Sequence, residues 1–292
     1  MDNAQIEKIV FHLKHPILKK DLRAAIAKHL DARYQSVEKL IAILAKDNSI
    51  KKYSMTARNG KTISVCCSVP LSDIDTYQLT TSLLPNGYFS NLTAIYHHSL
   101  TNQIPNTIYW CHESLAPQVN RAVEMLPDTV IRSAFIKPHR HTNFVFTHNT
   151  QDIVVTATTR GTDYGVETVK HLHSPCPVGS RITCLERTLI NAVISPHYNG
   201  GLSSISTYFK AASQKLDINK LIVIYKKLDF IYPYAQSLGF FMDYCGMSRK
   251  AEKWRKAYPP QQKFYIDHGA KSTWTYNERW MLFHPKGFKH EH

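Results

Sequence analysis

Apolar residues in the first fifty positions recur with the period of an α-helix. Between residues 6 and 13 they are spaced i, i+3, i+4, i+7, which predicts an amphipathic helix that ends at His15-Pro16. A second stripe over residues 18–29 and a third over residues 37–44 have similar spacing. Each stripe predicts a short helix with one buried face.

The pattern changes from helical spacing to alternation after residue 50. In KTISVCCS, residues 61–68, apolar side chains alternate with polar ones, as in a half-buried strand. Asn59-Gly60 precedes this run and favours the positive φ angles of a tight hairpin. We therefore predict a β-hairpin on which Cys66 and Cys67 alternate between the inner and the outer face.

Three helices followed by a basic hairpin are the order of a winged helix-turn-helix, which we predict over residues 1–70. In that arrangement the third helix enters the major groove of DNA and the hairpin contacts the backbone. Base-edge contacts are expected from the start of the third helix, at Tyr34, Gln35, Ser36 and Lys39. Phosphate contacts are expected from Lys19, Lys20, Arg23, Lys51, Lys52, Arg58 and Lys61. A protein-docking module, or a domain whose charges are only solvated, remains the alternative.

The rest of the chain predicts a larger mixed domain. The acidic stretch before residue 86 favours a linker over residues 71–85 and a second domain over residues 86–292. Four runs predict strands, namely IPNTIYW, TVIRSAFI, TNFVFTH and DIVVTATTR. Helical stripes follow from residue 185 to residue 245, and KFYIDHG and RWMLFHP predict two late strands. This order predicts an α+β fold.

One predicted helix carries a start and a stop signal. Thr183 with Glu186 three residues later predicts a capping box, and Pro196 ends the helical stripe.

The charge indicates a polyanionic partner. The chain of 292 residues has a net charge of +14, and residues 1–70 contribute +7 of it, from 13 Lys+Arg against 6 Asp+Glu. Nucleic acid or an acidic surface is the usual partner of such a chain. The charged N-terminus does not resemble a signal peptide, the apolar runs are too short to span a membrane, and the six cysteines form no CxxC pair. We expect a cytoplasmic protein, of unknown oligomeric state.

Three segments together resemble the AbiEi family of antitoxins. They are LTAIYHHSLTNQIPNTIYW (92–110), ITCLERTLINAVISPHYNGG (182–201) and LDINKLIVIYKKLDFIYPYAQSLGFFMDYCGM (216–247). The family pattern has a helix with SHLSALxxHGLTEQIP, an ERTLIDA helix, a paired glycine and xLGxLL. With the winged helix, the resemblance covers nearly the whole chain. It departs at Asn191, where the family usually has Asp, and at His97-His98.

The resemblance implies a function in two parts. Such proteins repress their own operon through the winged domain, and they oppose a co-encoded nucleotidyltransferase toxin through the C-terminal domain. They act in toxin–antitoxin systems and phage defence, and they are not enzymes. Double-stranded DNA of the chain's own promoter and such a toxin are therefore the expected partners.

Histidines suggest a metal site, but their pattern does not support one. His171-Leu172-His173 with Cys176 is the best cluster, and His139-Arg140-His141 is the next. A zinc site needs about four ligands, often in pairs at set spacings, and paired cysteines are absent. We predict no metal and no cofactor.

A nuclease is the rival interpretation from the enzyme class. Asp163, Glu167 and Lys170 could bind Mg²⁺ and activate water. The usual pattern has one residue between the carboxylate and the lysine, whereas this chain has two, which gives the wrong geometry on a strand. A third interpretation is a winged-helix regulator whose second domain senses a ligand and has no toxin.

A basic segment over residues 246–263 combines a net charge of +5 with Trp254 and Tyr258. It is either a solvated helix face or a contact to DNA or to an acidic partner. The residues expected to form a partner surface are Arg249, Lys250, Trp254 and Arg255.

Overall fold

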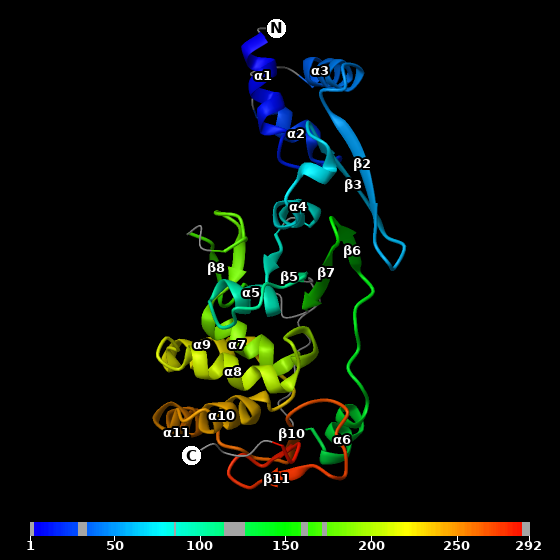
Figure 1. Cartoon of the computed structure of the whole chain (residues 1–292). Helices are drawn as coiled ribbons and strands as arrows, with labels where there is room; N and C mark the ends of the chain where they lie inside the picture. Colours follow the sequence, from blue (N-terminus) through cyan, green and yellow to red (C-terminus); the bar gives the residue numbers. More distant parts are fainter. Residues whose placement is uncertain are drawn as a thin grey trace.

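The computed structural model describes residues 3–28, 34–84, 86–113, 126–158, 163–170 and 174–287. These residues form eleven α-helices and three β-sheets, so the fold is α+β, as the sequence predicts. Figure 1 shows the N-terminal helices at one end, the largest sheet in the middle and the C-terminal strands at the opposite end.

The first unit combines three helices with a small antiparallel sheet. Its elements are, in chain order, α1 (Asn3–His12), β1 (Ile17–Leu18), α2 (Leu22–Ala27), α3 (Tyr34–Lys46), β2 (Lys51–Thr56) and β3 (Thr62–Cys67). The strand order is β1-β3-β2. The second helix is shorter than its apolar stripe, because Leu18 belongs to β1 and pairs with Val65. The predicted hairpin is confirmed, with Gly60 at a φ of +82° in its turn.

Strand β3 is buried on both faces, which differs from the predicted alternation. Cys66 is 4% exposed and packs with the three helices. Cys67 is 0% exposed and packs with Val65 in a second cluster, on the other face of the strand. Neither cysteine faces solvent, because each face of β3 is covered by a different core.

The segment expected to be a linker is a buried helix. Residues 71–85 include η1 (Leu71–Asp73) and α4 (Thr76–Leu83), which Asp75 caps by accepting a hydrogen bond from the Gln78 N–H at 3.1 Å. Leu79 and Leu83 lie four residues apart on the buried face of α4. The linker prediction is therefore wrong: the acidic residues that suggested a boundary belong to a helix start.

A six-stranded sheet forms the middle of the molecule. Its strands are β4 (Tyr88–Phe89), β5 (Thr107–Glu113), β6 (Val145–His148), β7 (Gln151–Thr158), β8 (Val166–Thr168) and β9 (Arg181–Thr183). Their order is β6-β7-β5-β4-β9-β8, in which β5 is parallel to β7, β4 is parallel to β9, and the other pairs are antiparallel. The second cluster joins β3 and α4 to this sheet through Phe146, Ile153 and Val155.

One predicted strand is a helix. TVIRSAFI lies in α6 (Asp128–Ile136), whereas the other three runs overlap β5, β6 and β7. Ile131 and Phe135 are four residues apart and both are buried, which is the spacing of a helix face. Pro127 precedes the helix.

Helices dominate the remainder of the chain. They are α5 (Asn91–His97), α7 (Leu185–Ile194), the short η2 (Pro196–Tyr198), α8 (Leu202–Ala212), α9 (Ile218–Leu228), α10 (Tyr234–Tyr244) and α11 (Ser248–Ala257). A small sheet of β10 (Phe264–Tyr265), β12 (Leu282–His284) and β11 (Thr275–Asn277) packs with them. Gly239 of α10 has a specific role, because a β-carbon there would overlap the Trp280 ring.

No helix in the described ranges is long and apolar enough to cross a membrane. The six cysteines are all unpaired thiols. Burial raises the pKa of the Cys66 and Cys67 thiols, which keeps them protonated and unreactive.

Candidate nucleic-acid interface

The outer face of the β2–β3 hairpin carries a lysine and a row of hydroxyls. Lys52, Ser54 and Thr56 alternate along β2 and are exposed. Ser54 pairs with Ser64 across the hairpin, and Thr56 pairs with Thr62, whose hydroxyl lies 2.9 Å from that of Thr56. Lysines and hydroxyls are the usual donors to phosphate oxygens. This face can therefore follow a nucleic-acid backbone.

A basic groove lies beside strand β3 of this hairpin. Its volume is about 560 Å³, and Lys19, Lys20 and Lys61 line it together with backbone and side chains of Thr62 and Ile63. Strand β1 pairs with β3 only at residues 65 and 66, so the β1 side of Thr62 and Ile63 has no strand partner in the described chain. Three lysines that the sequence singled out thus converge at one edge of the sheet.

Helix α3 is the element expected to read base edges. Lys39 is exposed on it. Tyr34, Gln35 and Ser36 form its first turn, and their side chains lie outside the described part of the structure. Arg23 does not point away as a free phosphate contact, because its guanidinium lies 3.3 Å from Glu38 and ties α2 to α3.

The tip of the hairpin is attached to the large sheet, which changes the role of Arg58. Its guanidinium donates to Asp152 of β7 at 2.6 Å, and its backbone N–H donates to the Val145 carbonyl of β6 at 2.9 Å. Lys61 lies over the Phe144 ring at 4.9 Å. Arg58 was predicted to contact DNA phosphate; in the structure its exposed guanidinium forms a surface ion pair with Asp152.

Sequence reasoning missed the hydroxyl row. The signal was available, because Lys52, Ser54 and Thr56 are spaced i, i+2, i+4 and must share one face of a strand.

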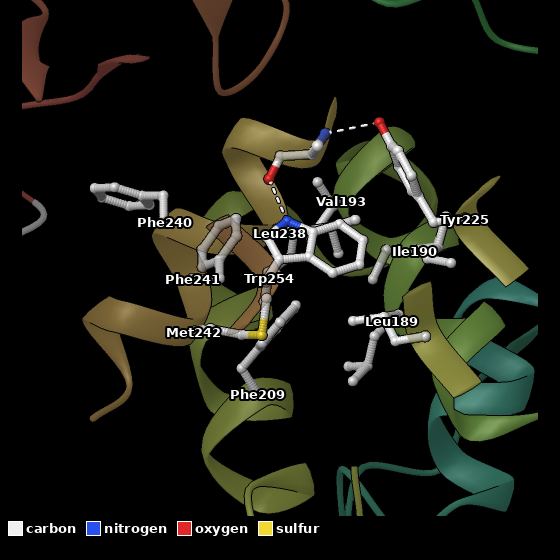
Figure 2. Packing of buried hydrophobic residues seen from close by; sticks show 14 of the residues in the cluster. Leu189, Ile190, Val193, Phe209, Tyr225, Leu238, Phe240, Phe241, Met242 and Trp254 are labelled. Atoms are coloured by element: carbon white, nitrogen blue, oxygen red, sulfur yellow. Dashed lines mark hydrogen bonds between the residues drawn. The ribbon is translucent and has the colours of Figure 1, made fainter. Parts of the chain in front are cut away.

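Two of the four residues predicted to form a partner surface on α11 are exposed. Arg249 and Arg255 are exposed, but Trp254 is 0% exposed, so its assignment to a binding surface is wrong. Figure 2 shows the Trp254 indole inside the cluster that includes Leu238 and Phe241. The indole N–H donates to the Ala235 carbonyl at 2.8 Å. The tryptophan anchors α11 to the core.

Lys250 is also used inside the molecule. Its ammonium donates to the Ser213 carbonyl at 2.6 Å and to the Leu216 carbonyl at 2.7 Å, at the end of α8. Lys253 and Lys256, which were not singled out, are exposed on α11. The solvent face of this helix is therefore basic without an aromatic anchor.

The capping box predicted for α7 is absent. Cys184 is the N-cap residue, and the Thr183 hydroxyl lies 2.7 Å from that of Thr188. Glu186 instead joins α7 to the start of α9: it accepts from the Asp217 N–H at 3.2 Å and lies 2.9 Å from the Lys220 ammonium. The Glu of the ERTLINA segment is a buried link between helices.

His139 and His141, the next-best histidine cluster of the sequence, lie close to two further histidines in the structure. His139 stacks on His197 with ring centroids 3.9 Å apart, and His141 and His268 flank this pair. Asp267 forms an ion pair with His139. The described residues contain no group of His, Cys, Asp or Glu arranged to bind a metal ion. His171 and His173 lie outside the described residues.

The three candidate nuclease residues are exposed or paired at the surface. Asp163 pairs with Arg181 at 2.5 Å, and Glu167 is exposed on β8. Lys170 is exposed beyond the end of that strand.

Comparisons with known proteins do not extend these observations. No protein-family model matches the sequence, and no curated protein sequence matches it. Among solved structures, the chain is similar to the RV2827C protein from Mycobacterium tuberculosis, with a TM-score of 0.48 and 13% identity over 96% of this chain and 91% of that chain. A likeness at this TM-score carries no argument about function.

The histidine cluster predicts a loss of stability in acid. Burial, followed by His139 and His141, lowers the pKa of His197 to about 4. Above pH 6.5 the side chain is neutral in both the folded and the unfolded state, so it contributes no pH dependence. As the pH falls from 6.5 towards 4, the unfolded state takes up a proton that the folded state does not, and the free energy of unfolding decreases. Urea denaturation at several pH values measures this decrease.

The matched variant is His197→Gln, which removes the titration, and His12→Gln on the exposed face of α1 is the control. We expect a shallower decrease in the first variant and an unchanged one in the second. Identical pH profiles for His197→Gln and the parent protein would contradict the assignment. Part of the decrease remains in the variant, because burial also lowers the pKa of His97 to about 4.

Proposed function

We propose that residues 1–70 act as a winged helix-turn-helix that binds duplex DNA, and that the chain represses its own promoter. The observation that carries this proposal is the element order helix, strand, helix, helix, strand, strand, with β1 added as the third strand beside β3. A winged helix has this order, and its third helix is the one that enters the major groove.

The contact between the hairpin tip and the large sheet reduces the number of residues that we propose to contact DNA. Since Arg58 is paired with Asp152, phosphate contacts fall to Lys51 and Lys52 on β2 and to Lys19 and Lys20 in the basic groove. The exposed hydroxyls of the hairpin add neutral donors. Base reading belongs to the start of α3, where Gln35 and Lys39 offer the donors and acceptors that base edges require.

Neutralising the four lysines tests the proposed backbone contacts. A variant with Gln at Lys19, Lys20, Lys51 and Lys52 should bind its upstream promoter duplex more weakly. The slope of log K against log salt should fall by about 0.9 for each lost phosphate contact. Fluorescence anisotropy across a salt series measures both quantities.

The matched control replaces four other exposed lysines with Gln, namely Lys137, Lys215, Lys226 and Lys271, which lowers the net charge equally. Equal effects of the two variants would mean that general charge, and not this surface, binds DNA. A second variant with Ala at Gln35 and Lys39 should lose the preference for the promoter over unrelated duplex by about tenfold or more, while weak binding persists. Retained preference would remove α3 from the proposal.

We further propose that the remainder of the chain opposes a co-encoded nucleotidyltransferase toxin. This part rests on the resemblance of the ERTLINA and SLGFFM segments to the AbiEi antitoxins. The exposed basic face of α11 is the proposed contact, now composed of Arg249, Lys253 and Lys256, which are spaced i, i+4, i+7. Such a face suits an acidic surface on the partner.

Charge reversal on α11 tests this contact. A variant with Glu at Arg249, Lys253 and Lys256 should fail to protect cells that express the neighbouring toxin gene, at unchanged protein level. The same reversal at Lys215, Lys226 and Lys271 is the control and should protect fully. If the α11 variant protects as well as the control, the toxin does not bind at this helix.

A further inference from the structure

A pocket of about 400 Å³ lies between the large sheet and the helices, away from the proposed DNA surface. Cys111 of β5 and Thr156 of β7 form its floor, close to the carboxyl ends of these two parallel strands. Parallel strands commonly present ligands at this end. Its volume is that of a site for a small organic molecule.

One face of α7 forms a wall of this pocket and brings a cation to it. Arg187, Asn191 and Ile194 are spaced i, i+4, i+7 along the helix, and all three line the pocket. The Arg187 side chain is 4% exposed. Its Nε donates to the Asn191 amide oxygen at 3.0 Å, and one terminal nitrogen donates to the Tyr164 carbonyl at 2.9 Å. The guanidinium is thus fixed in orientation by two neutral acceptors.

The charge of Arg187 is only partly compensated. Within the described chain its nearest carboxylate is Glu113, whose Oε1 lies 3.9 Å from the second terminal nitrogen, beyond hydrogen-bond distance. The Tyr88 hydroxyl donates to that same carboxylate oxygen at 2.7 Å and competes for it. A buried cation whose counter-ion lies 3.9 Å away is incompletely compensated, so an anion that hydrogen-bonds directly to the guanidinium would bind favourably.

Aromatic side chains form the opposite wall. Tyr198 of η2, the loop residues Phe230 and Tyr232, and Tyr234 at the start of α10 line the pocket. Tyr232 and Tyr234 have ring centroids 6.0 Å apart. Aromatic faces of this kind stack on planar rings. Ile231, at the rim, is 46% exposed, which leaves an apolar edge at the entrance.

The backbone beside the pocket is strained. Asn91 adopts a φ of +49°, a left-handed conformation that is uncommon for a residue with a side chain. Its side chain accepts from the Asn199 amide at 3.2 Å and donates to the Ser90 hydroxyl at 3.2 Å, and both Asn91 and Ser90 line the pocket. Strain that is held by hydrogen bonds is characteristic of ligand sites.

We propose that this pocket binds a small aromatic anion, with the anionic group on Arg187 and the planar ring against Tyr198 and Tyr232. A nucleoside monophosphate and an aromatic carboxylate share this chemistry. The site would give the second part of the chain a ligand-dependent state, separate from DNA binding.

The test measures binding of AMP and of 4-hydroxybenzoate to the full-length protein by isothermal titration calorimetry. At least one of them should bind with a Kd of about 1 mM or tighter. Adenosine lacks the anionic group, and inorganic phosphate lacks the aromatic ring. Each should bind at least about tenfold more weakly than AMP if AMP is the better ligand.

The decisive variant is Asn191→Asp, which keeps the shape of the side chain and the hydrogen bond to Arg187 but adds a carboxylate 3.0 Å from the guanidinium. It should weaken binding by about tenfold or more, whereas Asn106→Asp, on an exposed loop, should not. Ile194→Trp, which fills the pocket without a charge change, should also abolish binding. The proposal is overturned if neither probe binds, if phosphate alone binds as tightly as AMP, or if both pocket variants bind like the parent protein.

Discussion

The fold depends on one strand that is shared by two hydrophobic cores. Cys66 of β3 packs under the three N-terminal helices, and Val65 and Cys67 pack on the opposite face against α4 and the large sheet. A strand of an independent winged domain would leave one face to solvent. Here the second face contacts Phe146 and Ile153, residues that lie more than 75 positions further along the chain. The N-terminal unit and the large sheet are therefore parts of one packed body, and the buried helix α4 lies where a linker was expected.

This shared core has a direct consequence for the proposed function. The Arg58–Asp152 ion pair and the hydrogen bond to Val145 fix the hairpin tip against β6 and β7. Side chains near the tip then serve this contact, and the proposed DNA surface is limited to the root of the hairpin, the basic groove and α3. The pocket at Arg187 lies in the same body, since α7 packs on the sheet whose edge strand contacts the hairpin (Figure 1). A ligand there and DNA at α3 would bind to the same packed body.

The sequence predicted helices and strands better than it predicted which residues are buried by tertiary packing. Helical stripes predicted α1, α3 and the helices from α7 to α10, because a regular period survives any tertiary context. The run TVIRSAFI was assigned to a strand on β-branched content, although Ile131 and Phe135 have helical spacing. Trp254 was assigned to a surface because of its charged neighbours, yet it extends the stripe of Met247 and Ala251, which are both buried. The Arg187 pocket could not be predicted, because its residues come from six separate helices and strands and from the loop before α10.

Amide hydrogen exchange on the full chain tests the shared core most directly. Phe146→Ala removes a fully buried side chain from the large sheet. It should lower the free energy of unfolding of the segments that pack against it by about 3–5 kcal/mol. If β3 is shared as described, exchange at Val65 and at Met55 of β2 should accelerate together with exchange at Ile153, although no residue of the hairpin has been changed. Acceleration confined to β6 and β7, with β2 and β3 protected as before, would show that the N-terminal unit folds independently and would contradict the account.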